Sequence, residues 1–198
     1  MKITILGPQA SGKSTQAEIL AQRLGYLWVS PGKILRRAYQ EKTPWGLKAA
    51  SFWLQGELVP DQLLHQIIEF WLKKRGYKKG DGVVIEGYPR DLNQLHSPYY
   101  RQLWGEMDLA IFLFLSRRQI MQRLEKRKRL EHRLDEKPSV IARRLAIYEA
   151  NISPILEYYR EMKILHELDG SPGIEEVAEA IWQIVTEYRQ KRGEKKKK

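Results

Sequence analysis

Gly7-Pro-Gln-Ala-Ser-Gly12-Lys13-Ser14-Thr15 decides the fold of this 198-residue chain. It has the spacing G-x-x-x-x-G-K-S/T, in which backbone N–H groups and a helix N-terminus form a nest for phosphate oxygens. An apolar run with β-branched residues (1–6) precedes it, and residues 16–24 follow with apolar side chains at helical spacing. Strand, loop and helix in this order predict a phosphate-binding loop. The lysine approaches the β- and γ-phosphate oxygens, and the serine hydroxyl is within reach of Mg²⁺.

The composition excludes several classes of protein. Hydrophobic residues make up 42% of the chain, which argues against wholesale disorder. No stretch reaches the ~20 apolar residues of a membrane-spanning helix. The absence of cysteine excludes disulfides, thiol catalysis and cysteine-based metal sites. The four histidines are scattered without ligand spacing, so neither zinc nor another built-in metal centre is expected. We expect a cytoplasmic protein without a membrane partner.

The formal charge of +11 has two sources, a lysine-rich tail at 191–198 and a dense run of Arg and Lys between 117 and 144. Nucleic-acid binding is one use of such a charge. It would require a recognisable recognition module, and we identify none in the sequence. Nucleic acid is therefore not an expected partner.

Apolar runs alternate with stretches of helical periodicity along the whole chain. Strands are expected at 1–6, 26–29, 83–86, 109–115 and 162–168. Helices are expected at 16–24, 31–37, 45–55, 61–74 (capped by Asp61), 117–129, 138–160 and 174–188. This alternation predicts an α/β fold with a five-stranded parallel sheet covered on both faces. Ligands in such folds bind beyond the carboxyl ends of the strands, where the phosphate-binding loop and residues 86–90 lie.

A set of arginines narrows the reaction class. One follows the second strand, one follows the third, and the others flank a polar turn. Transfer of a phosphoryl group between polyphosphates gathers negative charge, which planar and permanently charged guanidinium groups stabilise. Each arginine alone is explained as a solvated surface charge, but together they favour phosphoryl transfer. The set is Arg36, Arg90, Arg123, Arg127, Arg133 and Arg144.

Over nearly its full length the chain resembles adenylate kinase and the related nucleoside-monophosphate (NMP) kinases. Ser-Pro-Gly-Lys-Ile-Leu-Arg (30–36), Gly-Glu-Leu-Val (56–59) and Glu-Gly-Tyr-Pro-Arg (86–90) are similar to the family segments S-T-G-D-x-L-R, G-x-x-V and D-G-F/Y-P-R. The positions that match the family's lid-flanking arginines, its R-x-D and its Y…P…YY helix are Arg123, Arg127, Arg133-Leu-Asp135, Arg144, Tyr148, Pro154 and Tyr158-Tyr159.

The resemblance implies one three-layer α/β/α P-loop NTPase domain. Its core would comprise 1–29, 60–127 and 138–190, followed by the basic tail 191–198. A small helical NMP-binding segment would span 30–59, and a short lid 128–137. Only residues 128–132 separate Arg127 from Arg133, too few for a zinc or β-rich lid. The NMP-binding segment and the lid would close over bound substrates and exclude water.

The resemblance also implies a reaction, the reversible Mg²⁺-dependent transfer of a phosphoryl group from ATP to AMP, giving two ADP. The implied catalytic residues are Lys13, Arg90, Arg127, Arg133 and Arg144. The implied ATP contacts are Gly7, Ala10, Ser11, Gly12, Lys13, Ser14, Thr15, Arg123, Arg127, Ser171 and Pro172. The implied AMP contacts are Ser30, Arg36, Glu57, Val59, Gly87, Arg90, Gln94, Arg133 and Arg144. Magnesium would be held mainly by the nucleotide, with Ser14 and Glu86 as candidate protein contacts, and Asp135 would orient lid arginines.

Gln94 favours AMP as the acceptor. Its amide matches the donor and acceptor pattern of the adenine edge, whereas uracil presents the opposite pattern. A UMP/CMP kinase or a broad NMP kinase is the first alternative. A P-loop ATPase or RNA-associated regulatory protein is an alternative of another class. The choice of ATP or GTP as donor stays open. So does the choice between a monomer and a small homo-oligomer, because Tyr99, Tyr100 and Trp104 suit a core or an interface.

Five positions depart from the family's usual residues. Ala10 and Ser14 replace glycine, Pro31 replaces threonine, and Lys33 and Glu86 replace aspartate. Glu86 is one methylene longer than aspartate, and Pro31 lacks both a hydroxyl and a backbone donor. These departures concern acceptor specificity and metal geometry more than the reaction itself.

Overall fold

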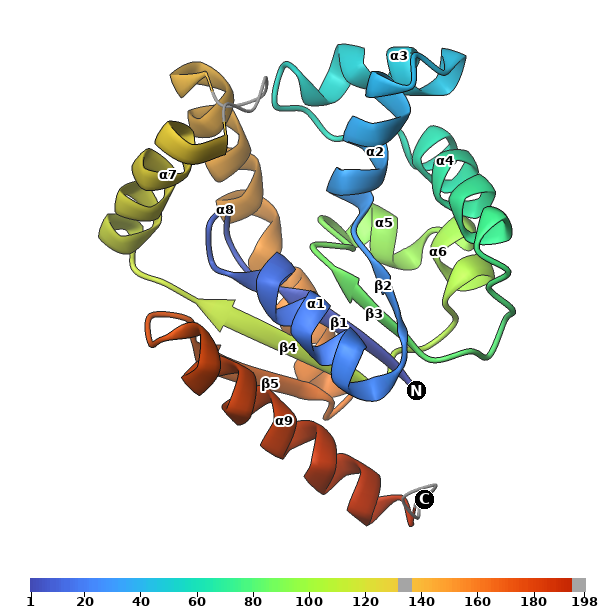
Figure 1. The fold of residues 1–198 in the computed structure, drawn as a ribbon, viewed down its shortest axis with the longest axis vertical. Helices are drawn as coiled ribbons and strands as arrows, with labels where there is room; N and C mark the ends of the chain where they lie inside the picture. The colour runs from blue at the N-terminus through green and yellow to red at the C-terminus, as the bar shows by residue number, and fades with distance from the viewer. Residues whose placement is uncertain (132–136, 194–198) are drawn as a thin grey trace.

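Five short parallel strands form the middle layer of the molecule (Figure 1). The computed structural model describes residues 1–131 and 137–193, with the backbone alone for 128–131. The strands are β1 (Lys2–Leu6), β2 (Leu27–Val29), β3 (Val83–Glu86), β4 (Leu109–Phe114) and β5 (Leu165–Asp169). Their order across the sheet is β2-β3-β1-β4-β5. The first strand therefore lies in the centre, and its carboxyl end delivers the phosphate-binding loop to the middle of the sheet edge.

Helices connect the strands and cover both faces of the sheet (Figure 1). Within the described residues they are α1 (Lys13–Leu24), α2 (Pro31–Gln40), α3 (Pro44–Trp53), α4 (Asp61–Lys74), α5 (Leu92–His96), α6 (Pro98–Leu103), α7 (Arg117–Glu131), α8 (Pro138–Glu161) and α9 (Ile174–Lys191). Proline at the first helical position starts α2, α3, α6 and α8, where its missing N–H costs nothing and its fixed φ suits a helix.

Alternating side chains of the strands divide between two cores. Ile3 and Ile5 of β1 pack with α1 and α9 on one face, where Leu20 and Ile181 are buried. On the other face Leu6 joins a larger core formed with α4, α6 and α8. Both faces are apolar because a parallel sheet is covered on both sides.

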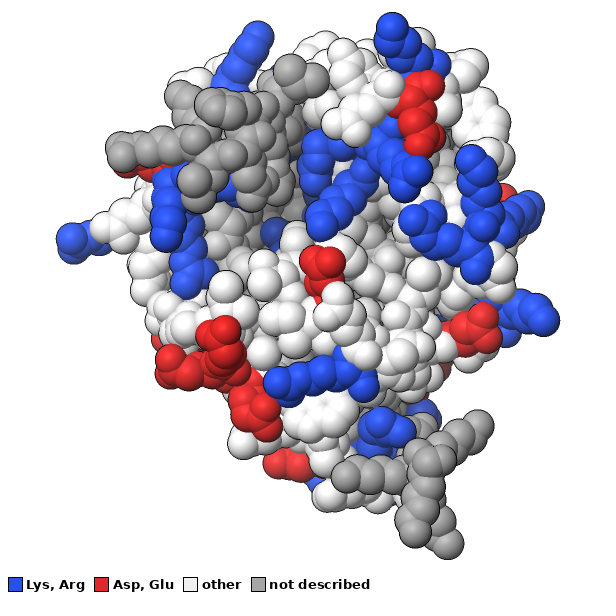
Figure 2. All heavy atoms as spheres, viewed as in Figure 1, with Lys and Arg blue, Asp and Glu red and all other residues white. Residues whose placement is uncertain are grey.

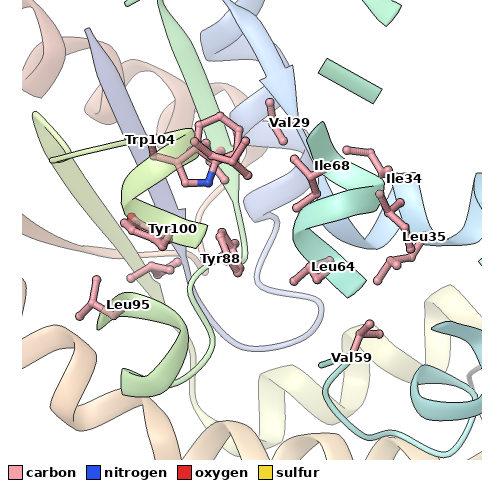
Figure 3. Close-up of a cluster of buried hydrophobic side chains, with 14 of the residues drawn as sticks. Val29, Ile34, Leu35, Val59, Leu64, Ile68, Tyr88, Leu95, Tyr100 and Trp104 are labelled. Atoms are coloured by element: carbon pink, nitrogen blue, oxygen red, sulfur yellow. The ribbon is translucent and has the colours of Figure 1, made fainter. Parts of the chain in front are cut away.

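Two of the three aromatic residues that suited either a core or an interface, Tyr100 and Trp104, lie in the larger core. Tyr100 and Trp104 are 3% and 1% exposed and pack beside Tyr88 (Figure 3). The hydroxyls of Tyr100 and Tyr159 are 3.0 Å apart, so the buried polar atoms satisfy each other. These two residues therefore belong to the core. Tyr99 is half-buried, with its ring 5.0 Å from that of His65.

The sequence-based elements agree with the structure in type and order, with shifts of up to three residues at several ends and three further differences. The helices α5 and α6 were not expected, since each is shorter than two turns and gives little periodicity. The strand β5 begins at Leu165 because α8 extends to Glu161. The prediction that Asp61 caps its helix is wrong: Pro60 is the N-cap residue, no side chain caps it, and Asp61 bonds to Gln94 instead.

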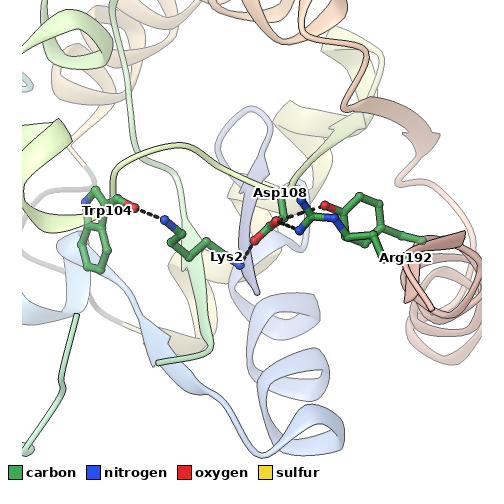
Figure 4. Close-up of polar contacts among 5 residues, drawn as sticks. Lys2, Trp104, Asp108 and Arg192 are labelled. Atoms are coloured by element: carbon green, nitrogen blue, oxygen red, sulfur yellow. Dashed lines mark hydrogen bonds and ion pairs between the residues drawn. The ribbon is translucent and has the colours of Figure 1, made fainter. Parts of the chain in front are cut away.

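A polar cluster fastens the amino ends of the central strands to the last helix (Figure 4). The carboxylate of Asp108, just before β4, accepts hydrogen bonds from the backbone N–H of Lys2 at 2.7 Å, from Tyr188 at 3.0 Å and from Arg192 at 2.6 Å. The ammonium of Lys2 donates to the carbonyl of Trp104 at 2.5 Å. One carboxylate thus joins β1, β4 and α9 at the end of the sheet opposite the phosphate-binding loop.

Candidate active site

One cavity opens at the carboxyl ends of β1 and β3. The phosphate-binding loop supplies Lys13 and Ser14, the turn after β3 supplies Glu86 and Arg90, and α2 supplies Arg36. The other walls come from the segment after α3 and from α7 and α8, through Gly56, Leu58, Arg127, Arg144, Tyr148 and Ile152. Residues far apart in the sequence thus line one cavity.

The phosphate-binding loop has the backbone that its glycines predict. Gly7 has φ 152°, and a Cβ there would lie 2.7 Å from the carbonyl of Leu113. Gly12 caps α1 with φ 89°. Ala10 has φ 60° although it is not glycine, a left-handed conformation that costs an L-residue roughly 1–2 kcal/mol. The ammonium of Lys13 donates to the carbonyl of Pro8 at 2.9 Å, across the loop.

The phosphate-binding loop contains buried polar atoms that lack hydrogen-bond partners in the described structure, a feature typical of a ligand-binding site. Within the described residues, the Oγ of Ser11 and the Oε1 of Gln9 are buried and have no hydrogen-bond partner. Unpaired buried polar atoms are rare and costly in native proteins. Their presence beside the glycine-rich backbone fits a loop that binds a polar ligand.

The turn after β3 brings Glu86 and Arg90 close to Lys13 of the phosphate-binding loop. Gly87 has φ 63°, and a Cβ there would lie 3.2 Å from the Cε of Lys13. The Nε of Arg90 donates to the carbonyl of Gly87 at 3.0 Å. Glu86 is 7% exposed and accepts a hydrogen bond from the hydroxyl of Ser30. Ser30 also caps α2 by accepting from the N–H of Lys33 at 3.3 Å, so β3 and α2 are joined at the cavity.

Ser14 and Glu86 line this cavity together and offer oxygen atoms of the kind that Mg²⁺ prefers. No group of three or more acidic or histidine side chains suited to a metal occurs in the part of the chain that the structure describes. Mg²⁺ in nucleotide enzymes is held by phosphates, waters and one or two protein ligands. The residues present fit that mode of binding.

The predicted donor-base contacts also lie together. Arg123 of α7 donates to the carbonyl of Ser171 at 3.1 Å, so α7 meets the loop after β5. Asp169 accepts from the N–H and the hydroxyl of Ser171 at 2.8 and 2.7 Å. These hydrogen bonds, first from the hydroxyl and then from the backbone N–H of Ser171, lower the pKa of Asp169. Pro172 follows in the same loop.

The segment after α3 lies against α8. Arg144 donates to the carbonyl of Trp53 at 3.0 Å, and Arg143 forms an ion pair with Glu57 at 2.7 Å. A Cβ on Gly56 would lie 2.9 Å from the carbonyl of Val140. The sequence analysis did not single out Arg143. Only its place one residue before Arg144 could have drawn attention to it.

Gln94 occupies a more enclosed position than its expected role implies. It is 2% exposed, its Oε1 accepts from the N–H of Arg90 at 2.8 Å, and its side chain bonds to Asp61. Val59 is buried in the larger core. Among the described residues, neither Gln94 nor Val59 lines the cavity.

Some predicted site residues cannot be placed. Arg133 and Asp135 lie outside the described residues, and so does half of the predicted lid, residues 132–136 of 128–137. In the other direction, the sequence analysis did not single out Ile152 of the cavity wall, and it matched Tyr148 to a family motif without giving it a role in the site. Ile152 and Tyr148 lie four residues apart on α8, a spacing that places them on one helix face.

The fold and the cavity first define a class. A phosphate-binding loop at the centre of a parallel sheet, with Arg36, Arg90, Arg127 and Arg144 around the same cavity, is the arrangement of a P-loop phosphotransferase. The family is then given by comparison with known proteins. The family model of adenylate kinase matches residues 5–164, and the chain belongs to the adenylate kinase family.

Known adenylate kinases are similar to this chain over about nine-tenths of its length. The adenylate kinase of Bifidobacterium longum (strain NCC 2705) is 34% identical over 183 residues, covering 91% of this chain and 97% of the relative. Adenylate kinase 1 of Nostoc sp. (strain PCC 7120) is 34% identical over 184 residues, covering 91% and 96%. The adenylate kinase of Thermobifida fusca (strain YX) is 30% identical over 181 residues, covering 90% and 95%.

These findings confirm the predicted family, the predicted fold class and the predicted enzyme class, an NMP kinase of the ATP:AMP type. The pyrimidine-kinase and RNA-associated alternatives receive no support from these relatives. Across residues 1–131 and 137–193, none of the helices combines the length and the apolar character needed to cross a membrane.

Proposed function

We propose that this chain transfers the γ-phosphoryl group of Mg·ATP to AMP, reversibly and without a covalent intermediate, through the residues around the cavity. The observation that carries the proposal is the gathering of Lys13 and four arginines around one cavity, where Glu86 is the single lining carboxylate among the residues that the structure describes. Two nucleotides that meet there bring several negative charges, which this excess of cations balances.

The donor would lie on the phosphate-binding loop. Loop N–H groups and Lys13 would hold its phosphates, with the helix N-terminus of α1 adding a favourable dipole. Arg123 and the loop at Ser171 and Pro172 would border its adenine, as their contact supports. Bound Mg²⁺ would supply positive charge against the negative charge that develops on the phosphates during transfer. Ser14 and Glu86 would hold that ion together with the nucleotide.

The acceptor would lie between the NMP-binding segment and the turn after β3. Arg36 and Arg90 both line the cavity and would clamp its α-phosphate. Gln94 accepts from the N–H of Arg90, so it links this clamp to the place of the acceptor base. We propose that its amide turns to the adenine edge when AMP binds, with Ser30, Glu57, Val59 and Gly87 shaping the pocket.

Catalysis would then consist of positioning and charge stabilisation. Arg127 and Arg144 line the same cavity as Lys13 and would contact the phosphoryl group during transfer. Arg133 is assigned the same role by the family resemblance. The apolar side chains of Ile147 and Ile152 would help to exclude water, so that ATP is not hydrolysed.

The test is to incubate the purified protein with Mg·ATP and, separately, AMP, UMP, CMP and GMP, and to follow nucleoside diphosphates by chromatography. Rapid ADP formation with AMP and little product with the others is the expected result. Efficient turnover of UMP or CMP would overturn the role of Gln94. Intact ATP binding without transfer to any acceptor would overturn the enzyme assignment.

A further inference from the structure

A second groove lies at the edge of the sheet, away from the phosphate-binding loop. It has a volume of about 680 Å³ and lies between β2, α2 and the C-terminal end of α4. Four cationic side chains line it, with two tryptophans and one acidic side chain, Glu41. Arg36 lines both this edge groove and the active-site cavity. The cations and rings that define the edge groove apart from it are Lys33, Arg37, Arg75, Trp28 and Trp71.

Cations stack on the aromatic rings in this edge groove. The ammonium of Lys33 lies 4.0 Å from the ring centroid of Trp28, and the guanidinium carbon of Arg75 lies 3.7 Å from that of Trp71. A stacked guanidinium presents a flat, positively charged face to any further planar group. The groove thus offers flat aromatic surface and positive charge at the same place.

Positive charge in the edge groove is only partly balanced. Arg37 bonds to Glu41 at 2.7 Å, and Lys33 approaches Glu18 at 3.9 Å. Arg75 is exposed and has no ion pair within the described residues. Arg37 and Arg75 line the same groove, and burial, followed by repulsion from the like charge of Arg37, lowers the pKa of Arg75. An anion near both would relieve that repulsion.

The face around the edge groove is basic as well. Figure 2 shows Lys and Arg side chains gathered over α2 and α4, with few acidic side chains among them. Part of the formal charge of +11 is therefore concentrated beside two tryptophans. Phosphates spaced along a chain of planar bases have the complementary chemistry.

We propose that the edge groove binds single-stranded nucleic acid, with a phosphate near Arg37 and Arg75 and a base stacked on the Trp71–Arg75 pair. A single strand fits because its bases are free to stack, whereas the bases of a duplex are covered by each other. The proposal does not depend on the kinase reaction. It revises the expectation from sequence that nucleic acid is not a partner. The cations and rings of the groove come from two segments, 28–37 and 71–75, that are far apart in the sequence. A search for a continuous recognition module therefore does not find them.

The experiment measures binding of a fluorescently labelled short oligouridylate to the full-length protein at several salt concentrations. Each measurement is made without and with a bisubstrate analogue that occupies the active site. Arg75→Glu and Trp71→Leu change the groove. The matched controls are Arg101→Glu, an exposed arginine of α6, and Trp45→Leu, an exposed tryptophan of α3. Unchanged ATP:AMP turnover in Arg75→Glu shows that this variant is folded.

Arg75→Glu and Trp71→Leu should each weaken binding about fivefold or more, while their controls stay within about twofold. Arg75→Glu should also reduce the slope of log Kd against log salt by about one. Equal losses of affinity in Arg75→Glu and Arg101→Glu would overturn the proposal, because they would show general electrostatic attraction and no specific site in the groove. Failure to bind once the bisubstrate analogue is present would place the strand in the active site. If free AMP displaced the oligouridylate at an equal concentration of bases, the groove would bind single nucleotides as well as it binds a strand. That result would overturn the proposal of a single-strand site.

Discussion

Glu86 and Ser30 exemplify how single residues connect the phosphate site to the acceptor side. The carboxylate of Glu86 ends β3, and the hydroxyl of Ser30 starts α2, so their hydrogen bond crosses between two elements. Both side chains are buried at the cavity, where a charge needs a hydrogen-bond partner. Ser30 therefore supports both the helix start and the orientation of the carboxylate.

Ser30→Ala should lower the free energy of unfolding by about 3 kcal/mol, because it removes a helix cap and leaves a buried carboxylate without its donor. Urea denaturation measures the loss. Ser97→Ala is the matched control, since Ser97 is a buried cap of α6 that bonds only to the N–H of Tyr99 among the described contacts. It should cost about 1 kcal/mol. Equal losses in the two variants would show that the contact with Glu86 adds nothing.

Arg90→Ala should reduce kcat by about 10²–10³-fold and leave the Kd for ATP within about twofold, because the guanidinium is proposed to bind the acceptor and not the donor. Steady-state kinetics and equilibrium binding of ATP separate the two effects. Arg101→Ala removes an exposed arginine of α6 and should change neither value. A parallel loss of ATP affinity in Arg90→Ala would contradict the assignment.

Asp61→Asn should raise stability at neutral pH. Burial, followed by the charge of Asp91, raises the pKa of Asp61, and the hydrogen bond from Gln94 opposes this in part. A carboxyl whose pKa is higher in the folded state stabilises the fold only below its unfolded pKa and loses that contribution as pH rises through its folded pKa. The gain from asparagine should therefore be full at pH 7 and vanish below the ordinary value of 3.8. Urea midpoints across pH test this, and a gain that persists at pH 3 would contradict it.

Among the elements, the last helix is held by charge as well as by apolar packing. Val177, Ile181 and Val185 bury one face of α9 against the sheet. At its C-terminal end Tyr188 and Arg192 donate to Asp108, which also accepts from the backbone of β1 (Figure 4). The cluster lies at the amino ends of the strands, so it fixes the frame of the sheet without touching the cavity.

Asp108→Ala should destabilise the protein by about 3 kcal/mol, since the side chain is only 16% exposed and three donors lose their acceptor. The kcat should stay within about twofold. Denaturation and kinetics on the same preparation give both values. Arg192→Ala removes one exposed donor and should cost about 1 kcal/mol or less. A large fall in kcat at full stability would show that the cluster reaches the active site.

At the scale of the whole molecule, the predicted NMP-binding segment 30–59 contacts α8 across the cavity. Arg144 holds the carbonyl of Trp53, and Arg143 pairs with Glu57 through side chains that are 53% and 37% exposed. Partly solvated contacts of this kind are weak and can open. We infer that the segment closes fully only when substrates bridge it to the phosphate-binding loop.

Paired labels test this closure cleanly because the chain has no cysteine. Gln55→Cys and Glu149→Cys place labels on exposed positions of the segment and of α8. The distance distribution between the labels should be broad in the free protein and should narrow and shorten with a bisubstrate analogue. Gln22→Cys on α1 and Glu179→Cys on α9 place a second pair of labels on exposed positions of two helices that cover the sheet. This pair serves as the control, and its distance distribution should not change. Identical distributions of the first pair with and without the analogue would contradict closure.

The sequence by itself determined the central features of this protein. The glycines around Lys13, the apolar strands and the alternation with helices predicted the phosphate-binding loop and the parallel sheet, because these depend on local backbone geometry and periodicity. The ordered arginine motifs indicated the family. Patterns of this kind can be recognised in the sequence because they depend on residues that are close together along the chain.

Only the tertiary structure decided which side chains share a space. It joined Ser30 to Glu86 and enclosed Gln94 between Arg90 and Asp61, none of which periodicity predicts. It also stacked the cations of the edge groove on tryptophans and set groove residues from two distant segments together. Contacts between distant segments depend on how whole elements pack. The sequence therefore predicted the chemistry of the candidate site, and packing decided which side chains each of its residues contacts.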